Sequence, residues 1–93
     1  MSNQTALVTG ASDGIGLAFC AILASRGYNL ILVARREVKL NEIARDLRQS
    51  QGVQCTVIAA DLSLPQAAQL LFQNTKDQGL QVDFLINNAG LLH

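Results

Sequence analysis

The sequence has little charge and few of the residues that usually carry specialised chemistry. It contains no tryptophan, one histidine, one tyrosine and one proline among 93 residues, and only 15% of the residues are charged. Seven basic and seven acidic side chains give a formal net charge of zero, which lacks the basic excess of nucleic-acid-binding proteins. No apolar run approaches the roughly 20 residues of a membrane span. We therefore expect neither a nucleic-acid partner nor a membrane partner.

Cysteine is also scarce, and the chain begins without a recognisable secretion signal. Cys20 and Cys55 are too few for a secreted disulfide framework and have no partners at metal-ligand spacing. We expect two small buried thiols and no metal site. The first residues, Met-Ser-Asn-Gln-Thr, include neither the basic nor the apolar region of a signal peptide. The expected location is the cytoplasm.

Hydrophobic residues make up 49% of the chain, which is enough to form a buried core. The length suits one domain over residues 1–93, and no repeat or linker divides it. Short apolar runs alternate with helix-length segments. The expected strands are 5–9, 29–34, 53–60 and 82–87, and the expected helices are 15–26, 38–50 and 66–78.

These runs are continuously apolar, which is typical of parallel strands buried on both faces of a sheet. The alternation predicts an α/β protein, namely the first half of a doubly wound Rossmann fold with strand order 3-2-1-4 and three helices. We expect the first two helices on one face and the third on the opposite face. One helix would then cover four apolar strands, and the last strand would be a bare edge. Exposed apolar surface and a homo-oligomer are therefore expected.

Two helices carry more specific predictions. The segment 15–26 is apolar on almost every side, so we expect it to be heavily buried. The segment 66–78 follows Ser63, Leu64 and Pro65. We expect Ser63 to cap this helix and Gln66 to complete a capping box, with Pro65 in the first turn.

The stretch TGASDGIG, residues 9–16, lies between the first expected strand and the first expected helix. Gly10 suits the tight turn after the strand, Gly14 allows a diphosphate to approach, and Gly16 allows the helix to pack closely on the sheet. Ser12 adds a hydroxyl donor, and the helix N-terminus attracts phosphate. The pattern lacks the lysine of a P-loop. The alternative is a structural turn whose glycines serve packing alone.

The end of the second strand indicates which dinucleotide is preferred. NAD sites use an acidic residue about 20 residues after the loop, whereas this strand ends in Ala34, Arg35 and Arg36. Ala34 also argues against a methyltransferase nucleoside site, which commonly has an acid there. A guanidinium can bind a 2′-phosphate in bidentate fashion. Arg35, assisted by Arg36, therefore favours NADP(H) over NAD(H), the alternative being two solvated arginines at the start of a helix.

Polar residues also follow the third and fourth strands. Asp61, followed by Leu62, can accept a hydrogen bond from an adenine amino group, or can simply cap a turn. Asn87 and Asn88 can bridge backbone groups of neighbouring strands, and the small Ala89 and Gly90 would keep the crevice floor open. The alternative for this last group is an ordinary asparagine-rich turn.

Together these motifs resemble the short-chain dehydrogenase/reductase family over essentially the whole chain. The glycine loop, the Asp61-Leu62 pair and NNAG at 87–90 match its N-terminal motifs in order and spacing, and the G-x-x-x-G-x-G spacing is that of its compact branch. The resemblance implies an NAD(P)-dependent oxidoreductase that acts on an alcohol or carbonyl substrate. Asp13 departs from the family's NADP-preferring members, many of which have a basic residue there.

The resemblance also implies roles for individual residues. Ser12, Gly14 and Ile15 would line the diphosphate, Asp61 and Leu62 would contact adenine, and the NNAG motif would lie beside the adenosine ribose. The family's catalytic Ser, Tyr-x-x-x-Lys and further Asn all follow NNAG. Tyr28, the only tyrosine, has Leu32 four residues later instead of lysine. We therefore assign no catalytic residue and expect these 93 residues to be inactive alone. The alternative is a non-enzymatic nucleotide-binding or interaction module.

Overall fold

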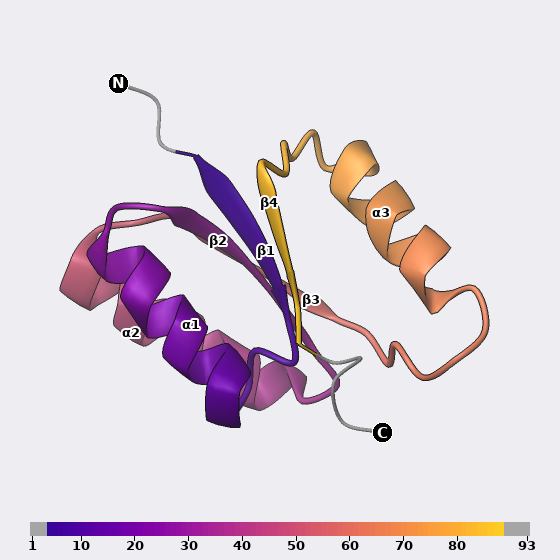
Figure 1. The fold of residues 1–93 in the computed structure, drawn as a ribbon, viewed down its shortest axis with the longest axis horizontal. Coiled ribbons are helices and arrows are strands. Elements are labelled where there is room, and N and C mark those ends of the chain that lie inside the picture. The colour runs from indigo at the N-terminus through magenta and orange to yellow at the C-terminus, as the bar shows by residue number, and fades with distance from the viewer. Residues whose placement is uncertain (1–3, 89–93) are drawn as a thin grey trace.

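The computed structural model describes residues 4–88 and forms a parallel sheet flanked by helices (Figure 1). The sheet has four strands in the order β3-β2-β1-β4, which confirms the predicted topology. The elements are β1 (Thr5–Thr9), α1 (Gly14–Ser25), β2 (Asn29–Ala34), α2 (Glu37–Gln51), β3 (Cys55–Ala59), α3 (Ala67–Asp77) and β4 (Phe84–Asn87).

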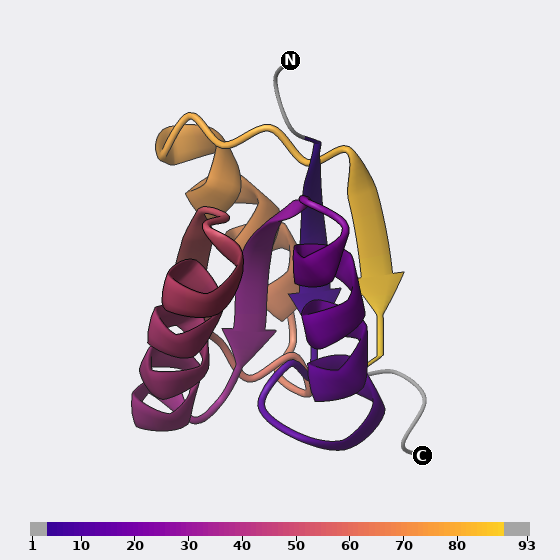
Figure 2. The same ribbon diagram turned by 90° about the vertical axis from the view of Figure 1, so that its left-hand side faces the viewer.

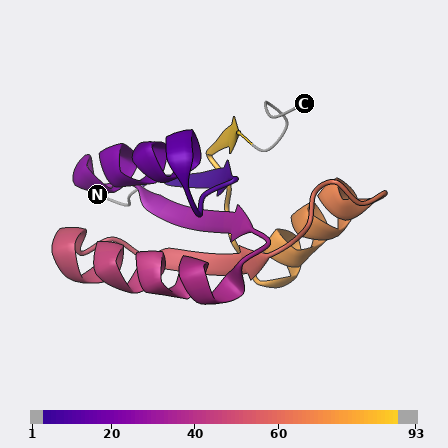
Figure 3. The ribbon, with the colours of Figure 1, turned by 90° about the horizontal axis from the view of Figure 1, so that it is seen from below.

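The helices divide between the two faces of the sheet as expected. Helices α1 and α2 lie on one face, and α3 lies on the other (Figures 2 and 3). Strand β1 is central, and its Leu7 pairs with Ile31 in β2 and with Leu85 in β4. The side chains of β1 alternate between two cores. Ala6 and Val8 belong to the core beneath α1 and α2, whereas Leu7 belongs to the core beneath α3.

Strands β3 and β4 are shorter than the sequence predicted. In β3, the residues that pair with β2 begin at Cys55, opposite Leu30, and end at Ala59, opposite Ala34. In β4, pairing with β1 begins at Phe84. The apolar runs extend beyond these limits because Val53 and Val82 also contribute apolar contacts to the cores. The first and last residues of a strand therefore depend on where it pairs with its neighbours, whereas an apolar run in the sequence indicates only which residues are buried.

The expectation that the first helix is heavily buried is wrong. Only Gly16, Cys20 and Ala24 of α1 are buried. Ile15, Phe19 and Ile22 are 63%, 40% and 51% exposed. A helix that lies on one face of a sheet buries one stripe, and no other described element covers the flank of α1 that carries these three side chains.

The predicted capping box at α3 is also wrong. The helix begins at Ala67, its N-cap residue is Gln66 with φ 65°, and no side chain caps it. The amide of Leu64 donates to the carbonyl of Asp61, and the amide of Ala67 donates to the carbonyl of Leu64. Two successive turns therefore separate Ser63 from the helix, and its hydroxyl bonds Asp61 instead.

Both cysteines are free and buried, as predicted. Burial raises the pKa of Cys20 to about 12 and also raises the pKa of Cys55. Within residues 4–88, no helix has the length and hydropathy needed to cross a bilayer. The same residues contain no cluster of three or more histidine, cysteine or acidic side chains placed to hold a metal ion.

Candidate coenzyme-binding site

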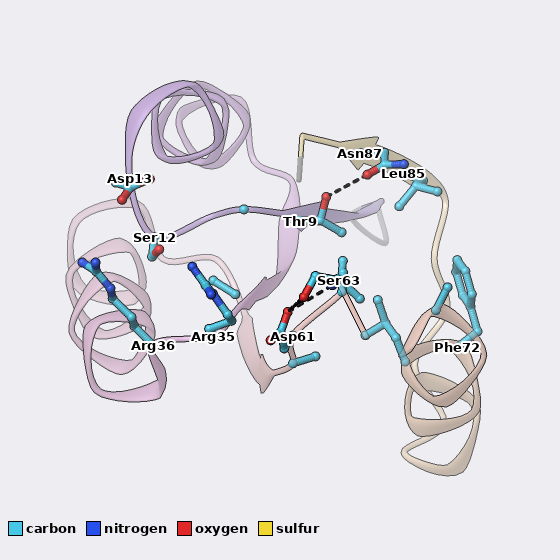
Figure 4. A pocket seen from close by; sticks show the side chains of 16 residues that line it. Thr9, Ser12, Asp13, Arg35, Arg36, Asp61, Ser63, Phe72, Leu85 and Asn87 are labelled. Carbon is cyan, nitrogen blue, oxygen red and sulfur yellow. Dashed lines mark hydrogen bonds between the residues drawn. The ribbon is translucent and has the colours of Figure 1, made fainter. Parts of the chain in front are cut away.

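A cavity of about 540 Å³ lies at the carboxyl ends of the strands, between the glycine loop and α3 (Figure 4). All four strands or the loops that follow them contribute to its wall. The lining residues are Thr9, Gly10, Ser12, Asp13, Ala34, Arg35, Arg36, Ala60, Asp61, Leu62, Ser63, Ala68, Leu71, Phe72, Leu85 and Asn87.

Most of the predicted site residues meet at this cavity. Eight of them line it: Gly10, Ser12, Asp13, Arg35, Arg36, Asp61, Leu62 and Asn87. Gly14, Ile15, Gly16 and Asn88 are not in the wall, and Ala89 and Gly90 lie outside the described residues. These side chains converge because the carboxyl ends of parallel strands share one edge of the sheet.

The glycine loop has a backbone that only glycine adopts without strain. Gly10 and Gly14 have φ values of 64° and 58°. A β-carbon on Gly14 would have no neighbour within 4 Å, so open space lies beside its backbone. A β-carbon on Gly16 would lie 2.0 Å from the carbonyl oxygen of Gly10. Gly16 therefore lets α1 begin in close contact with the loop.

The N-terminus of α1 follows this loop directly. Asp13 is the N-cap residue, its backbone is extended, and its side chain makes no capping hydrogen bond. No residue in the first turn of α1 is acidic. The helix dipole gives this end a positive potential, which suits an anionic group, and the Asp13 carboxylate at the N-cap offsets part of it.

Two cations and one anion stand at the next two strand ends. Arg35 and Arg36 follow β2, and Asp61 follows β3 (Figure 4). The Asp61 Oδ1 atom accepts two hydrogen bonds from Ser63, at 2.6 Å from Oγ and 3.0 Å from the backbone nitrogen. These bonds hold the pKa of the Asp61 carboxyl below its usual range, and the charge of Arg35 lowers this pKa further. Asp61 is thus a carboxylate at neutral pH.

Thr9 joins the ends of β1 and β4. Its Oγ1 accepts a hydrogen bond from the amide of Asn88 at 2.9 Å and lies 3.2 Å from Asn87 Oδ1. The side chain of Asn88 donates to the carbonyl of Gly10 at 3.4 Å. The side chain of Asn88 therefore bridges β4 to the backbone of the glycine loop, as the sequence predicted. The side chain of Asn87 instead accepts a hydrogen bond from the hydroxyl of Thr9.

Several lining residues were not foreseen. Thr9 could have been found, because it is the first residue of the glycine motif. Leu71 and Phe72 belong to α3, and Leu85 belongs to β4. Their hydrophobicity indicated only a helix and a strand, and no local signal shows that these elements border the cavity.

Comparison with known proteins identifies the family. The model of the short chain dehydrogenase family matches residues 4–93. The chain therefore belongs to the short-chain dehydrogenase/reductase family. This membership confirms the resemblance read from the motifs.

Individual relatives are similar over most of this chain but are much longer. The chain is 43% identical to a 7beta-hydroxysteroid dehydrogenase of Collinsella aerofaciens, over 85% of this chain and 29% of the relative. It is 44% identical to a very-long-chain 3-oxoacyl-CoA reductase of Pyrenophora tritici-repentis, over 95% of this chain and 26% of that reductase. The structure of L-sorbose reductase from Gluconobacter frateurii, complexed with NADPH and L-sorbose, has a TM-score of 0.86 at 34% identity, covering 94% of this chain and 33% of the reductase. The chain thus spans under a third of the length of these curated relatives.

Proposed function

We propose that the cavity binds NADP(H), and that the chain is the coenzyme-binding part of a reductase or dehydrogenase acting on a carbonyl or alcohol substrate. The observation that carries this proposal is the convergence of the glycine loop, two arginines and a carboxylate at one edge of the sheet. Each of these groups suits a different part of a dinucleotide. The similarity to a reductase complexed with NADPH supports the same proposal.

The diphosphate fits the glycine loop and the N-terminus of α1. The open space beside Gly14 leaves its backbone accessible to a large anion. The hydroxyl of Ser12 borders the cavity, and Ile15 lies in the first turn of α1. The positive helix end and the loop would together neutralise part of the diphosphate charge.

The adenosine part fits the other strand ends. Asp61 and Leu62 would hold the adenine base, and Asn87 would approach the ribose. Asn88 would act on the coenzyme indirectly, because its side chain holds β4 to the glycine loop. Ala89 and Gly90, which lie outside the described residues, are proposed to flank the same ribose.

The preference for NADP(H) rests on the charge at the end of β2. Arg35 and Arg36 both line the cavity, and α2 begins directly after Arg36. A 2′-phosphate carries negative charge and several acceptor oxygens, which suit guanidinium groups. Asp13 also lines the cavity, and its negative charge opposes this preference.

The bound coenzyme would exchange a hydride with the substrate. The residues of this chain would bind and orient its adenosine diphosphate end, and no residue of the chain is assigned to proton transfer. Catalysis is therefore proposed for the whole protein and not for these 93 residues alone.

Calorimetric titration of the chain with NADPH and NADH tests this proposal. We expect binding of both at up to millimolar concentration, with NADPH the tighter ligand because only NADPH carries the 2′-phosphate. The fluorescence of the reduced nicotinamide of NADPH gives an independent readout. Failure of both coenzymes to bind would contradict the site, and tighter binding of NADH would contradict the proposed preference.

We also propose that the chain forms a homo-oligomer. Phe84 and Leu85 of the edge strand β4 are 44% and 49% exposed, in addition to the exposed apolar flank of α1. Such surface favours association. Light scattering should give a mass of at least two chains, and Ile22→Lys on that flank should lower it more than the control Val38→Lys on α2. A wild-type monomer that binds no hydrophobic dye would contradict the proposal.

A further inference from the structure

Ser63 lines the cavity, yet the function proposed above gives it no role. It lies on the loop between β3 and α3, two residues after Asp61 (Figure 4). Both of its donors, the hydroxyl and the backbone amide, bond the same atom, Asp61 Oδ1. A turn closed by the amide of Leu64 and the carbonyl of Asp61 encloses this pair. The orientation of the Asp61 carboxylate is thus fixed within its own loop.

The two hydrogen bonds that Oδ1 accepts from Ser63 determine which acceptor positions of Asp61 remain available. A carboxylate oxygen has two acceptor positions, and Ser63 occupies both of those on Oδ1. Within residues 4–88, Oδ2 accepts no hydrogen bond. Arg35 acts on Asp61 through its charge and makes no hydrogen bond to it. Oδ2 is therefore an acceptor with no competing donor from the described chain.

An acceptor of this kind distinguishes between purine bases. The exocyclic amino group at position 6 of adenine is a donor, so it can bond Oδ2. The oxygen at position 6 of hypoxanthine is an acceptor, so its lone pairs would face a carboxylate that has no proton to offer. A 6-oxo purine would thus lose a hydrogen bond and meet electrostatic repulsion at the same place.

We propose that Ser63 is a positioning residue that directs Asp61 Oδ2 toward the base, and that it thereby makes the site select a 6-amino purine over a 6-oxo purine. This inference rests on the proposed coenzyme site and adds its base specificity. Ser63 acts through Asp61 and need not touch the coenzyme itself.

The test compares NADPH with reduced nicotinamide hypoxanthine dinucleotide phosphate, in which an oxygen replaces the 6-amino group of the base and N1 carries a hydrogen. The measured quantity is the ratio of the two dissociation constants. The wild-type chain should bind NADPH about tenfold more tightly, since one charge-assisted hydrogen bond at a partly exposed site is lost. Ser63→Ala, which keeps the backbone donor, should reduce this ratio to about threefold, and Ser63→Thr should restore it.

Two further variants separate positioning from general damage. In Asp61→Asn, the side-chain amide can donate a hydrogen bond to a 6-oxo group and its oxygen can still accept one from a 6-amino group, so the ratio should fall to about one or below. Ser50→Ala replaces an exposed serine at the far end of α2 and should leave the ratio unchanged. In a nuclear magnetic resonance titration, the pKa of Asp61 should rise in Ser63→Ala and stay unchanged in Ser50→Ala.

The outcomes distinguish this inference from the proposal beneath it. If neither coenzyme binds the wild-type chain, the proposed function fails and this inference fails with it. If both bind and the ratio is equal in wild type and Ser63→Ala, the coenzyme site stands and the role of Ser63 is refuted. If Ser63→Ala does not fold, Ser63→Cys takes its place, because a thiol is only a weak hydrogen-bond donor. A ratio equal to that of wild type then refutes the role of Ser63, and a lowered ratio supports it.

Discussion

Replacing Gly16 with alanine should destabilise the chain by about 3 kcal/mol, and replacing it with valine should prevent folding. The new β-carbon would lie 2.0 Å from the carbonyl oxygen of Gly10 and 2.8 Å from its carbonyl carbon. These are backbone atoms, so no rotation of a side chain relieves the overlap. Either α1 or the glycine loop must move, and the hydrogen bond from Asn88 to Gly10 would be disturbed with them.

The sign of this effect separates tertiary contact from helix propensity. Gly16 lies inside α1, and at an unobstructed helical site alanine is favoured over glycine by about 1 kcal/mol. Urea unfolding followed by circular dichroism measures the change. Gly14→Ala is the matched control, since its β-carbon meets nothing within 4 Å and only the positive φ opposes it. We expect it to cost about 1 kcal/mol. A Gly16→Ala chain as stable as wild type would refute the close approach.

Replacing Arg35 with aspartate should invert the coenzyme preference. The affinity for NADPH should fall by roughly a hundredfold, since a charge-assisted hydrogen bond is lost and a repulsion is added. The affinity for NADH should change little or improve, because a carboxylate can bond the ribose 2′-hydroxyl. Calorimetric titration of both coenzymes against wild type and variant gives the ratio directly.

Two further variants make this experiment specific to the cavity. Arg35→Ala removes the charge without adding a repulsive one, so it should weaken NADPH binding by about tenfold and leave NADH binding nearly unchanged. Arg45→Asp makes the same charge reversal at an exposed position of α2 outside the cavity wall. It should change the preference by less than about twofold, because exposed charges are screened over roughly 10 Å. Equal effects of Arg35→Asp and Arg45→Asp would assign the change to net charge alone.

Local pattern was enough to predict most of the fold. The expected strands 5–9 and 29–34 agree with β1 and β2 residue for residue. Both runs are apolar and end where a glycine or an arginine pair interrupts them. Gly52 ends α2 in the left-handed conformation, as expected of a glycine at that place. Because strands and helices alternate along the chain, few sheet topologies are possible, and these predict the observed strand order.

The sequence predicted burial and helix starts less well. The apolar composition of α1 suggested burial all round, but Phe19 and Ile22 are exposed. Composition reports how apolar a segment is, whereas burial depends on how many neighbours surround it. Ser63 had the right type and spacing for a helix cap. Its hydroxyl bonds Asp61 instead, because the turns around Leu64 place it beside that carboxylate.

The sequence by itself determined the class of fold, the glycine loop and the polar residues that follow each strand. These are local properties, since each depends on a short run of residues and its spacing. Tertiary structure alone decided that Phe72 and Leu85 border the same cavity and that Ser63 occupies one oxygen of Asp61. The physical reason is that strand ends meet by topology, which the order of elements predicts, whereas the packing of α3 and the turns before it depend on contacts between distant residues.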